Sequence, residues 1–139
     1  MHNRPHRQGG FSLIEALVAI LIFSFGVLAL IGLQVTSVRQ SSSAKYRSDA
    51  ALLANQLIGQ MWVTDRLAVN MQASFNTGGA QYNAWAATVG GALPGATGAN
   101  VPTVVVAANG QVTVRLFWKA PNEQPTDPVH QYTTIARIQ

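Results

Sequence analysis

Cysteine is absent from this 139-residue sequence, and charged residues are scarce. The lack of cysteine excludes disulfide bonds, thiolate metal ligands and a cysteine nucleophile. Charged residues make up 10% of the chain, compared with about 25% in an average soluble domain. The deficit is concentrated, because no charged residue occurs between Ala16 and Leu33. This distribution indicates a membrane segment in a chain with room for one domain of ordinary size.

The basic residues form no continuous stripe, although the formal net charge is +4. Arg4 and Arg7 precede the apolar run, and the other basic residues are scattered along the chain. Nucleic-acid-binding domains usually show a basic stripe or a recognisable module. We therefore expect no direct binding of nucleic acid.

The apolar run from Ala16 to Leu33 has the length of a membrane span. As a helix, its 18 residues reach roughly 27 Å at about 1.5 Å per residue. A bilayer hydrocarbon core is about 30 Å thick, and a lone span in lipid satisfies its backbone as a helix. Arg4 and Arg7 before the run predict a cytoplasmic N-terminus and an exported remainder.

Three features of this region argue against an ordinary secretory signal peptide. The apolar run exceeds the roughly 7–15 residues of such peptides, and the nearest small-residue site, Ser42-Ser43-Ala44, lies well beyond it. The third feature is the carboxylate of Glu15 at the entrance to the run, where an acid is costly in a membrane. The positive end of the helix dipole makes Glu15 tolerable there, but it does not explain the residue.

The stretch Gly10-Phe11-Ser12-Leu13-Ile14-Glu15 resembles the prepilin peptidase motif of type IV pilins and pseudopilins. In that motif a short basic leader ends in glycine and is followed by phenylalanine, three residues, glutamate and an apolar run. The resemblance covers about the first 35 residues. It implies that a membrane aspartyl peptidase cuts between Gly10 and Phe11, and that Phe11 is then N-methylated. It also implies that Glu15 meets the Phe11 ammonium of a neighbouring subunit during assembly.

The same resemblance implies the partners and the location of the chain. The partners are the prepilin peptidase, other major and minor pilins, the inner-membrane pilus assembly platform and membrane lipid. The precursor is expected as a single-pass protein of the inner membrane with a periplasmic head. After assembly it is expected in the pilus fibre or at its tip.

Two glycines within the apolar run, Gly26 and Gly32, have two alternative interpretations. Many major pilins carry a proline near the end of this run, and Gly32 occupies the matching region here. Glycine costs a helix about 1 kcal/mol relative to alanine, so Gly26 to Gly32 is a candidate for local melting in a filament. The alternative is close packing of neighbouring helices through small residues.

A helical pattern continues beyond the membrane and predicts one helix from about Ser12 to about Val63. Its apolar stripe recurs at steps of three or four residues and comprises Val35, Val38, Ser42, Tyr46, Ala50, Leu53, Leu57 and Met61. We therefore divide the chain into a cleaved leader (1–10), a transmembrane or filament-core helix (11–33), the amphipathic half of that helix (34–64) and a small head (65–139).

The head is predicted to contain three antiparallel strands. Residues 70–79 are predicted as a loop, 82–89 as a short helix, and Gly90-Gly91 as the start of a flexible connection. The strands are expected at 101–107, 111–119 and 130–138, with Asn109-Gly110 as a two-residue hairpin turn. A long helix packed on such a sheet is an α+β fold, and its order resembles the pilin fold.

The sequence shows no catalytic constellation, and we expect neither enzymatic activity, a cofactor nor a metal site. His130 is predicted to be a plain surface residue, and Asp49, Asp65, Glu123 and Asp127 show no metal-binding spacing. Trp85 and Trp118 are predicted core anchors.

The predicted function is therefore structural, as a minor pilin in the assembly or initiation of a type IV pilus, supporting adhesion, twitching motility or DNA uptake. Segments 51–56, 85–95 and 117–118 resemble the minor pilins called type IV pilus modification proteins. A minor pseudopilin of a type II secretion system, or a single-pass anchored periplasmic binding or enzymatic domain, stays open.

Overall fold

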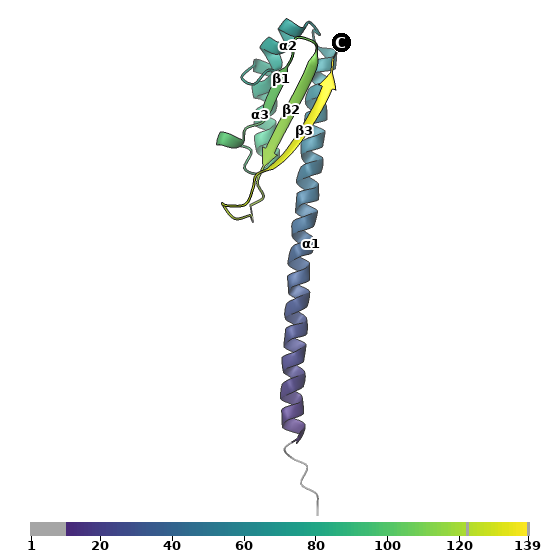
Figure 1. Cartoon of the computed structure of the whole chain (residues 1–139), viewed down its shortest axis with the longest axis vertical. Helices are drawn as coiled ribbons and strands as arrows, with labels where there is room; N and C mark the ends of the chain where they lie inside the picture. The colour runs from purple at the N-terminus through teal and green to yellow at the C-terminus, as the bar shows by residue number, and fades with distance from the viewer. Residues whose placement is uncertain (1–10, 122, 139) are drawn as a thin grey trace, which may run out of the picture. The chain divides into compact units, whose positions relative to one another are not determined.

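The computed structural model describes residues 11–121 and 123–138, which form an α+β structure with the pilin-like order of one long helix and then a sheet (Figure 1). The chain divides into two compact units, Met1–Ser41 and Ser42–Gln139. In chain order the elements are α1 (Phe11–Val63), α2 (Ala68–Phe75), α3 (Ala80–Ala92), the 3-10 helix η1 (Gly98–Asn100), β1 (Thr103–Val106), β2 (Gln111–Trp118) and β3 (His130–Arg137). The predicted fold class is confirmed.

The sheet is antiparallel with strand order β1-β2-β3. Alternate residues of β2 face the core, because side chains on a strand point to opposite faces in turn. The side chains of Val112, Val114, Leu116 and Trp118 are buried, as the alternation predicted. Across the middle of the sheet, Val105 and Ile135 flank Thr113 on the outer face.

The core of the second unit lies between the sheet and the end of α1. Leu53, Leu57 and Met61 of α1 are buried at helical spacing together with the inner residues of β2. Trp85 of α3 is buried and donates its indole N–H to the Leu53 carbonyl at 2.9 Å. Trp118 is also buried, so both predicted tryptophan anchors are confirmed.

The segment predicted as a loop at residues 70–79 is mostly helical, and that prediction was wrong for its first half. Helix α2 forms and continues to Phe75 because Met71 and Phe75, four residues apart, are both buried. Their burial outweighs the helix-disfavouring effect of the polar residues. Asp65 precedes the helix and accepts hydrogen bonds from the Leu67 N–H and the Asn70 side chain. These two bonds hold the pKa of the Asp65 carboxyl below its ordinary value.

Helix α3 is also longer than predicted, since it continues through Gly90-Gly91 to Ala92. The two glycines are unfavourable in a helix, but the buried side chain of Val89 lies just before them. The Leu93 N–H donates to the Val89 carbonyl at 2.8 Å, which closes the last turn. Tertiary packing therefore overrides the local preference of the glycine pair.

The hairpin between β1 and β2 has a three-residue loop instead of the predicted two-residue turn. The Ala107 N–H donates to the Gln111 carbonyl, and the Gly110 N–H donates to the Ala107 carbonyl at 3.0 Å. Gly110 has a φ of 77°, which is the left-handed conformation that closes three-residue hairpins with a bulge. The Ile138 N–H also donates to the Gly110 carbonyl, so this glycine joins both neighbouring strands.

We expect Gly110→Ala to destabilise the head more than Gly98→Ala. Both glycines have positive φ, but a Cβ at Gly110 would overlap the Ile138 carbonyl oxygen, whereas one at Gly98 meets nothing within 4 Å. The left-handed conformation costs alanine roughly 1–2 kcal/mol at either site. Overpacking adds about 1–3 kcal/mol at Gly110 alone. Thermal unfolding followed by near-ultraviolet circular dichroism in detergent measures the difference, and equal midpoints for the two variants would contradict the overlap.

Candidate functional site

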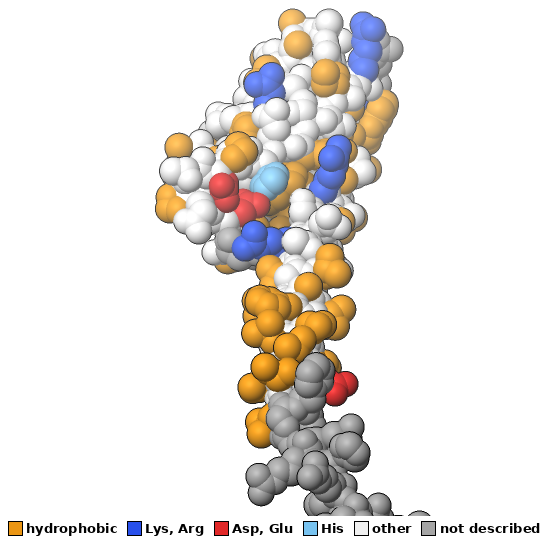
Figure 2. Space-filling model, turned by 60° about the horizontal axis from the view of Figure 1, so that its bottom comes forward, with side chains coloured by type: hydrophobic (Ala, Val, Ile, Leu, Met, Phe, Trp, Pro, Cys, Tyr) orange, Lys and Arg blue, Asp and Glu red, His pale blue; other side chains and the backbone are white. Residues whose placement is uncertain are grey.

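The N-terminal part of α1 exposes apolar side chains around its whole circumference. Large hydrophobic residues at every helical angle are exposed, and Figure 2 shows such side chains covering the visible surface of this segment. The exposed residues are Leu13, Ile14, Leu17, Val18, Ile20, Leu21, Ile22, Phe23, Phe25, Val27, Leu28, Leu30, Ile31 and Leu33. A helix that is hydrophobic all round is buried in a large core or in a membrane.

By length and composition, α1 qualifies as a membrane-spanning helix. Its most apolar window has a mean hydropathy of 2.8, and none of that window is buried within the chain. Among the described residues this is the one helix that meets these criteria. The described residues do not cover this apolar surface. Lipid and neighbouring helices are both suitable covers.

Two hydroxyl groups in this part of α1 are bonded to the backbone of the helix itself. The Ser24 hydroxyl donates to the Ile20 carbonyl at 2.7 Å, and the Thr36 hydroxyl donates to the Leu33 carbonyl at 2.8 Å. Hydroxyls that return to the preceding turn need no outside partner, so they lower the cost of an apolar environment. The segment is thus compatible with burial despite its polar residues.

Glu15 is the one charged residue between Leu13 and Val38. It lies in α1, is exposed, and follows the first helical residue, Phe11, by four positions. Residues four apart lie on the same face of a helix, with an axial separation of about 6 Å. The Glu15 side chain therefore lies about one helical turn beyond the Phe11 backbone nitrogen. Gly10 lies outside the described residues, and the roles of Gly10, Phe11 and Glu15 stay predictions.

Gly26 and Gly32 are helical, and a Cβ added at either position meets nothing within 4 Å. The helix therefore has no internal packing reason for a glycine at these positions. Both alternatives, local melting and close contact with neighbouring helices, concern the assembled state.

Hydrogen exchange separates these alternatives for the Gly26–Gly32 stretch. If the stretch melts in assembled filaments, its amides should exchange faster than those of flanking turns, and Gly26→Ala with Gly32→Ala should slow them. The two alanines together favour the helix by about 2 kcal/mol, which corresponds to roughly thirtyfold slower exchange. Uniform protection of the unsubstituted stretch would contradict melting and favour close packing.

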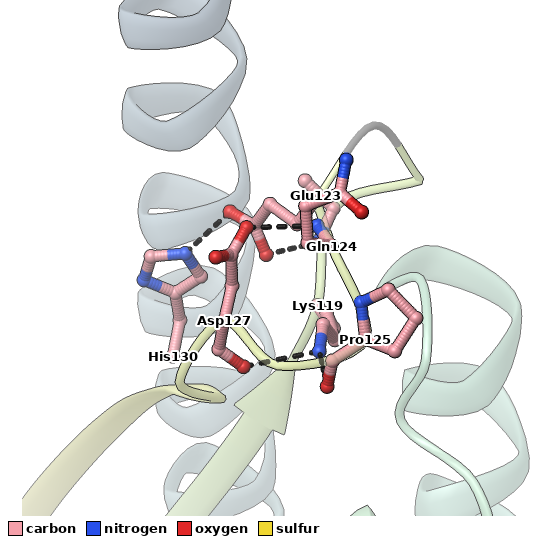
Figure 3. A network of polar contacts seen from close by, with 7 residues as sticks. Lys119, Glu123, Gln124, Pro125, Asp127 and His130 are labelled. Carbon is pink, nitrogen blue, oxygen red and sulfur yellow. Dashed lines mark hydrogen bonds and ion pairs between the residues drawn. The ribbon is translucent and has the colours of Figure 1, made fainter.

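In the head, the loop between β2 and β3 contains a polar network that the sequence reasoning missed (Figure 3). His130 Nε2 lies 2.6 Å from Glu123 Oε1, and the His130 ring stacks on Trp118 with centroids 5.7 Å apart. The other Glu123 oxygen accepts the Ala120 N–H at 3.0 Å. The Lys119 ammonium donates to the carbonyls of Pro125 and Asp127.

The prediction that His130 is a plain surface residue was therefore wrong. The six residues between Glu123 and His130 include two prolines and follow no regular spacing, so only the folded loop brings the pair together. Within the described residues no group of three or more His, Cys, Asp or Glu side chains is placed to hold a metal ion. The network consists of one carboxylate–imidazole pair and backbone contacts, which fit a role in holding the loop.

Comparison with known proteins identifies one family for the N-terminal segment. Residues 5–31 match the family described as the prokaryotic N-terminal methylation motif, which is about a fifth of the chain. No curated protein and no solved structure gives a significant match. The matched residues contain Gly10, Phe11 and Glu15 and the first part of the apolar helix. Together, the motif, the apolar helix and the α+β head support a type IV pilin-like or pseudopilin subunit.

Proposed function

We propose that this chain is a minor pilin, a structural subunit that takes part in the assembly or initiation of a type IV pilus. The observation that carries the proposal is Gly10-Phe11 and Glu15 at the start of a helix that is apolar all round. An ordinary anchor needs the apolar residues but gains nothing from the acid. Through the fibre, the subunit supports adhesion, twitching motility or DNA uptake.

The proposed mechanism starts with the precursor in the inner membrane, its N-terminus in the cytoplasm and its head in the periplasm. The prepilin peptidase cuts after Gly10, and Phe11 becomes an N-methylated terminus. The apolar helix then leaves lipid and packs against the helices of other pilins at the assembly platform. Because both environments are apolar, the transfer has little net hydrophobic cost.

Glu15 gives this packing a preferred register. Cleavage creates an ammonium at Phe11, and a carboxylate of a neighbouring subunit attracts it strongly where water is excluded. Buried ion pairs contribute more to specificity than to net stability in some systems, with the fixing of register as the best-attested case. In this proposal Glu15 selects the axial position at which an incoming helix stops.

The head has a structural role in this proposal, without catalysis, cofactor or metal. Segments Ala51–Gln56, Trp85–Gly95 and Phe117-Trp118 favour the PilV type of minor pilin, the type IV pilus modification proteins. The direct partners are the prepilin peptidase, other pilins, the assembly platform and lipid, and nucleic acid is not among them.

The alternative within the same motif is a minor pseudopilin of a type II secretion system, which shares the leader and the helix. Deletion of the gene separates the two. Lost surface pili and twitching support the pilin, whereas trapped exported proteins with normal pili support the pseudopilin. A single-pass anchored periplasmic domain is the outcome if the chain is never shortened.

The experiment that tests the family is the intact mass and the N-terminal sequence of the membrane form. The proposal expects a chain that starts at methylated Phe11. A membrane form that retains residues 1–10 would contradict it, because the apolar helix would then serve only as an anchor.

A further inference from the structure

The outer edge of β1 is closed by residues of α2 and of the segment directly after it. The Val104 N–H donates to the Thr77 hydroxyl, and the Val104 carbonyl accepts the Thr77 N–H. The Val106 N–H donates to the Asn76 carbonyl oxygen at 2.7 Å, and the Val106 carbonyl accepts the Gln72 amide at 3.0 Å. Proteins close sheet edges because unpaired edge groups invite another strand. Here the backbone N–H and C=O groups of both Val104 and Val106 are paired.

The outer edge of β3, in contrast, is open in the described part of the chain, where β3 is a terminal strand of the sheet. The Ile138 N–H donates to the Gly110 carbonyl, and in an antiparallel pair the bonded positions alternate. Every second residue before Ile138 therefore bonds to β2, and the residues between them direct their N–H and C=O groups away from the sheet. These outward residues are Gln131, Thr133, Ile135 and Arg137, and all four are exposed.

The outer face beside this edge is basic and partly apolar. Arg115 and Arg137 lie on it, and the strands carry no acidic residue. Within the described residues, no ion pair involves either arginine. Figure 2 likewise shows the acidic side chains of the visible head gathered beside the histidine. Ile135 adds an apolar side chain that is 61% exposed.

A small hollow lies at the end of this edge. Its volume is about 290 Å³, which has room for one side chain of a bound peptide. The lining residues are Asn109, Gln111, Ile135, Ala136 and Arg137. The hollow therefore lies among Arg137, Asn109 and Gln111, next to the last outward backbone groups of β3.

We propose that the β3 edge binds an extended acidic segment of another protein as a fourth strand. The backbone of the segment pairs with the outward groups of β3, and one of its carboxylates binds Arg137 at the hollow. Strand addition of this kind takes its affinity from the main chain and its specificity from alternate side chains. A second copy of this chain is a poorer occupant, because its β3 edge brings the same arginines and no acid. The inference concerns the head alone and holds whether the filament is a pilus or a secretion pseudopilus.

The test uses the full chain in detergent and a fluorescent, end-blocked peptide of eight residues that alternates valine and glutamate. A peptide with lysine in place of glutamate is the matched control. The glutamate peptide should bind, as measured by fluorescence anisotropy, and should slow hydrogen exchange across residues 131–137. Equal binding of the lysine peptide, or no slowing across 131–137, would overturn the proposal.

Two variants make the test specific. Thr133→Pro removes an N–H that points to the open edge, so it spares the β2 pairing but blocks an added strand. It should abolish binding while the near-ultraviolet circular dichroism of the head is retained. Arg137→Glu should weaken the binding of the glutamate peptide by about fivefold, which is the effect of one exposed ion pair. It should strengthen the binding of the lysine peptide. Unchanged preference in Arg137→Glu, or binding that survives Thr133→Pro, would refute the proposed site.

Discussion

The Gly10→Ala variant is expected to remain in the membrane as an uncut precursor that still carries residues 1–10. Glycine before the cut lets the backbone approach catalytic groups closely, because it has no Cβ. A methyl group there displaces the peptide bond, and a misplacement of about 1 Å costs on the order of a hundredfold in rate. The intact mass of the membrane fraction, with co-expressed prepilin peptidase, measures the fraction that is cut.

Gly9→Ala is the matched control for this prediction. It adds the same methyl group one residue earlier, away from the bond that is cut, so processing should stay near that of the unsubstituted chain. Both variants keep the apolar part of α1 intact, and both should therefore stay in the membrane fraction. Normal processing of Gly10→Ala would exclude the proposed cleavage site. An equal loss of processing in both variants would show that cleavage depends on the leader as a whole and not on Gly10 alone.

The Glu15→Ala variant is expected to be cut and methylated but to enter filaments poorly. Removing one partner of a buried ion pair leaves the other charge uncompensated, which costs about 3–5 kcal/mol. That penalty corresponds to a loss of roughly two to three and a half orders of magnitude in the assembly equilibrium, at about 1.4 kcal/mol per factor of ten. Quantitative mass spectrometry of the sheared filament fraction and the membrane fraction gives the ratio of the two pools.

Two further substitutions separate charge from shape at Glu15. Glu15→Gln keeps the size of the side chain without its charge, so it should assemble nearly as poorly as Glu15→Ala. Glu15→Asp keeps the charge on a shorter side chain and should assemble better than either. If α1 were only an anchor, removing the acid would favour the membrane state and change nothing else. Normal entry of Glu15→Gln into filaments would show that charge pairing is not the cause.

The parts of the fold that sequence predicted are those in which one physical effect dominates. In the N-terminal half of α1, the apolar run admits only a helix. In β2, alternation from Val112 to Trp118 matches one buried face, and the strand bounds follow. The failures occur where two effects compete. In α2 and at Gly90-Gly91, polar or glycine residues indicate a loop, but burial of Phe75 and Val89 stabilises a helix.

The candidate sites divide in the same way. Gly10, Phe11 and Glu15 belong to a linear motif within residues 5–31, so sequence alone identifies them. The Glu123–His130 pair and the open edge of β3 depend on loop closure and strand register, which no local pattern contains. The edge becomes visible only through contrast with β1, whose bonds come from Gln72, Asn76 and Thr77 in a distant segment.

The closed edge of β1 also limits how large a strand-paired assembly of these heads can become. Two heads can pair through their open β3 edges. The β1 edge of the second head is closed as well, so it cannot recruit a third head. Strand pairing between copies of the head would therefore stop at a dimer. A long repeat made from this protein therefore cannot come from strand pairing between heads, and a head can carry a strand of another protein without starting a continuous sheet of heads.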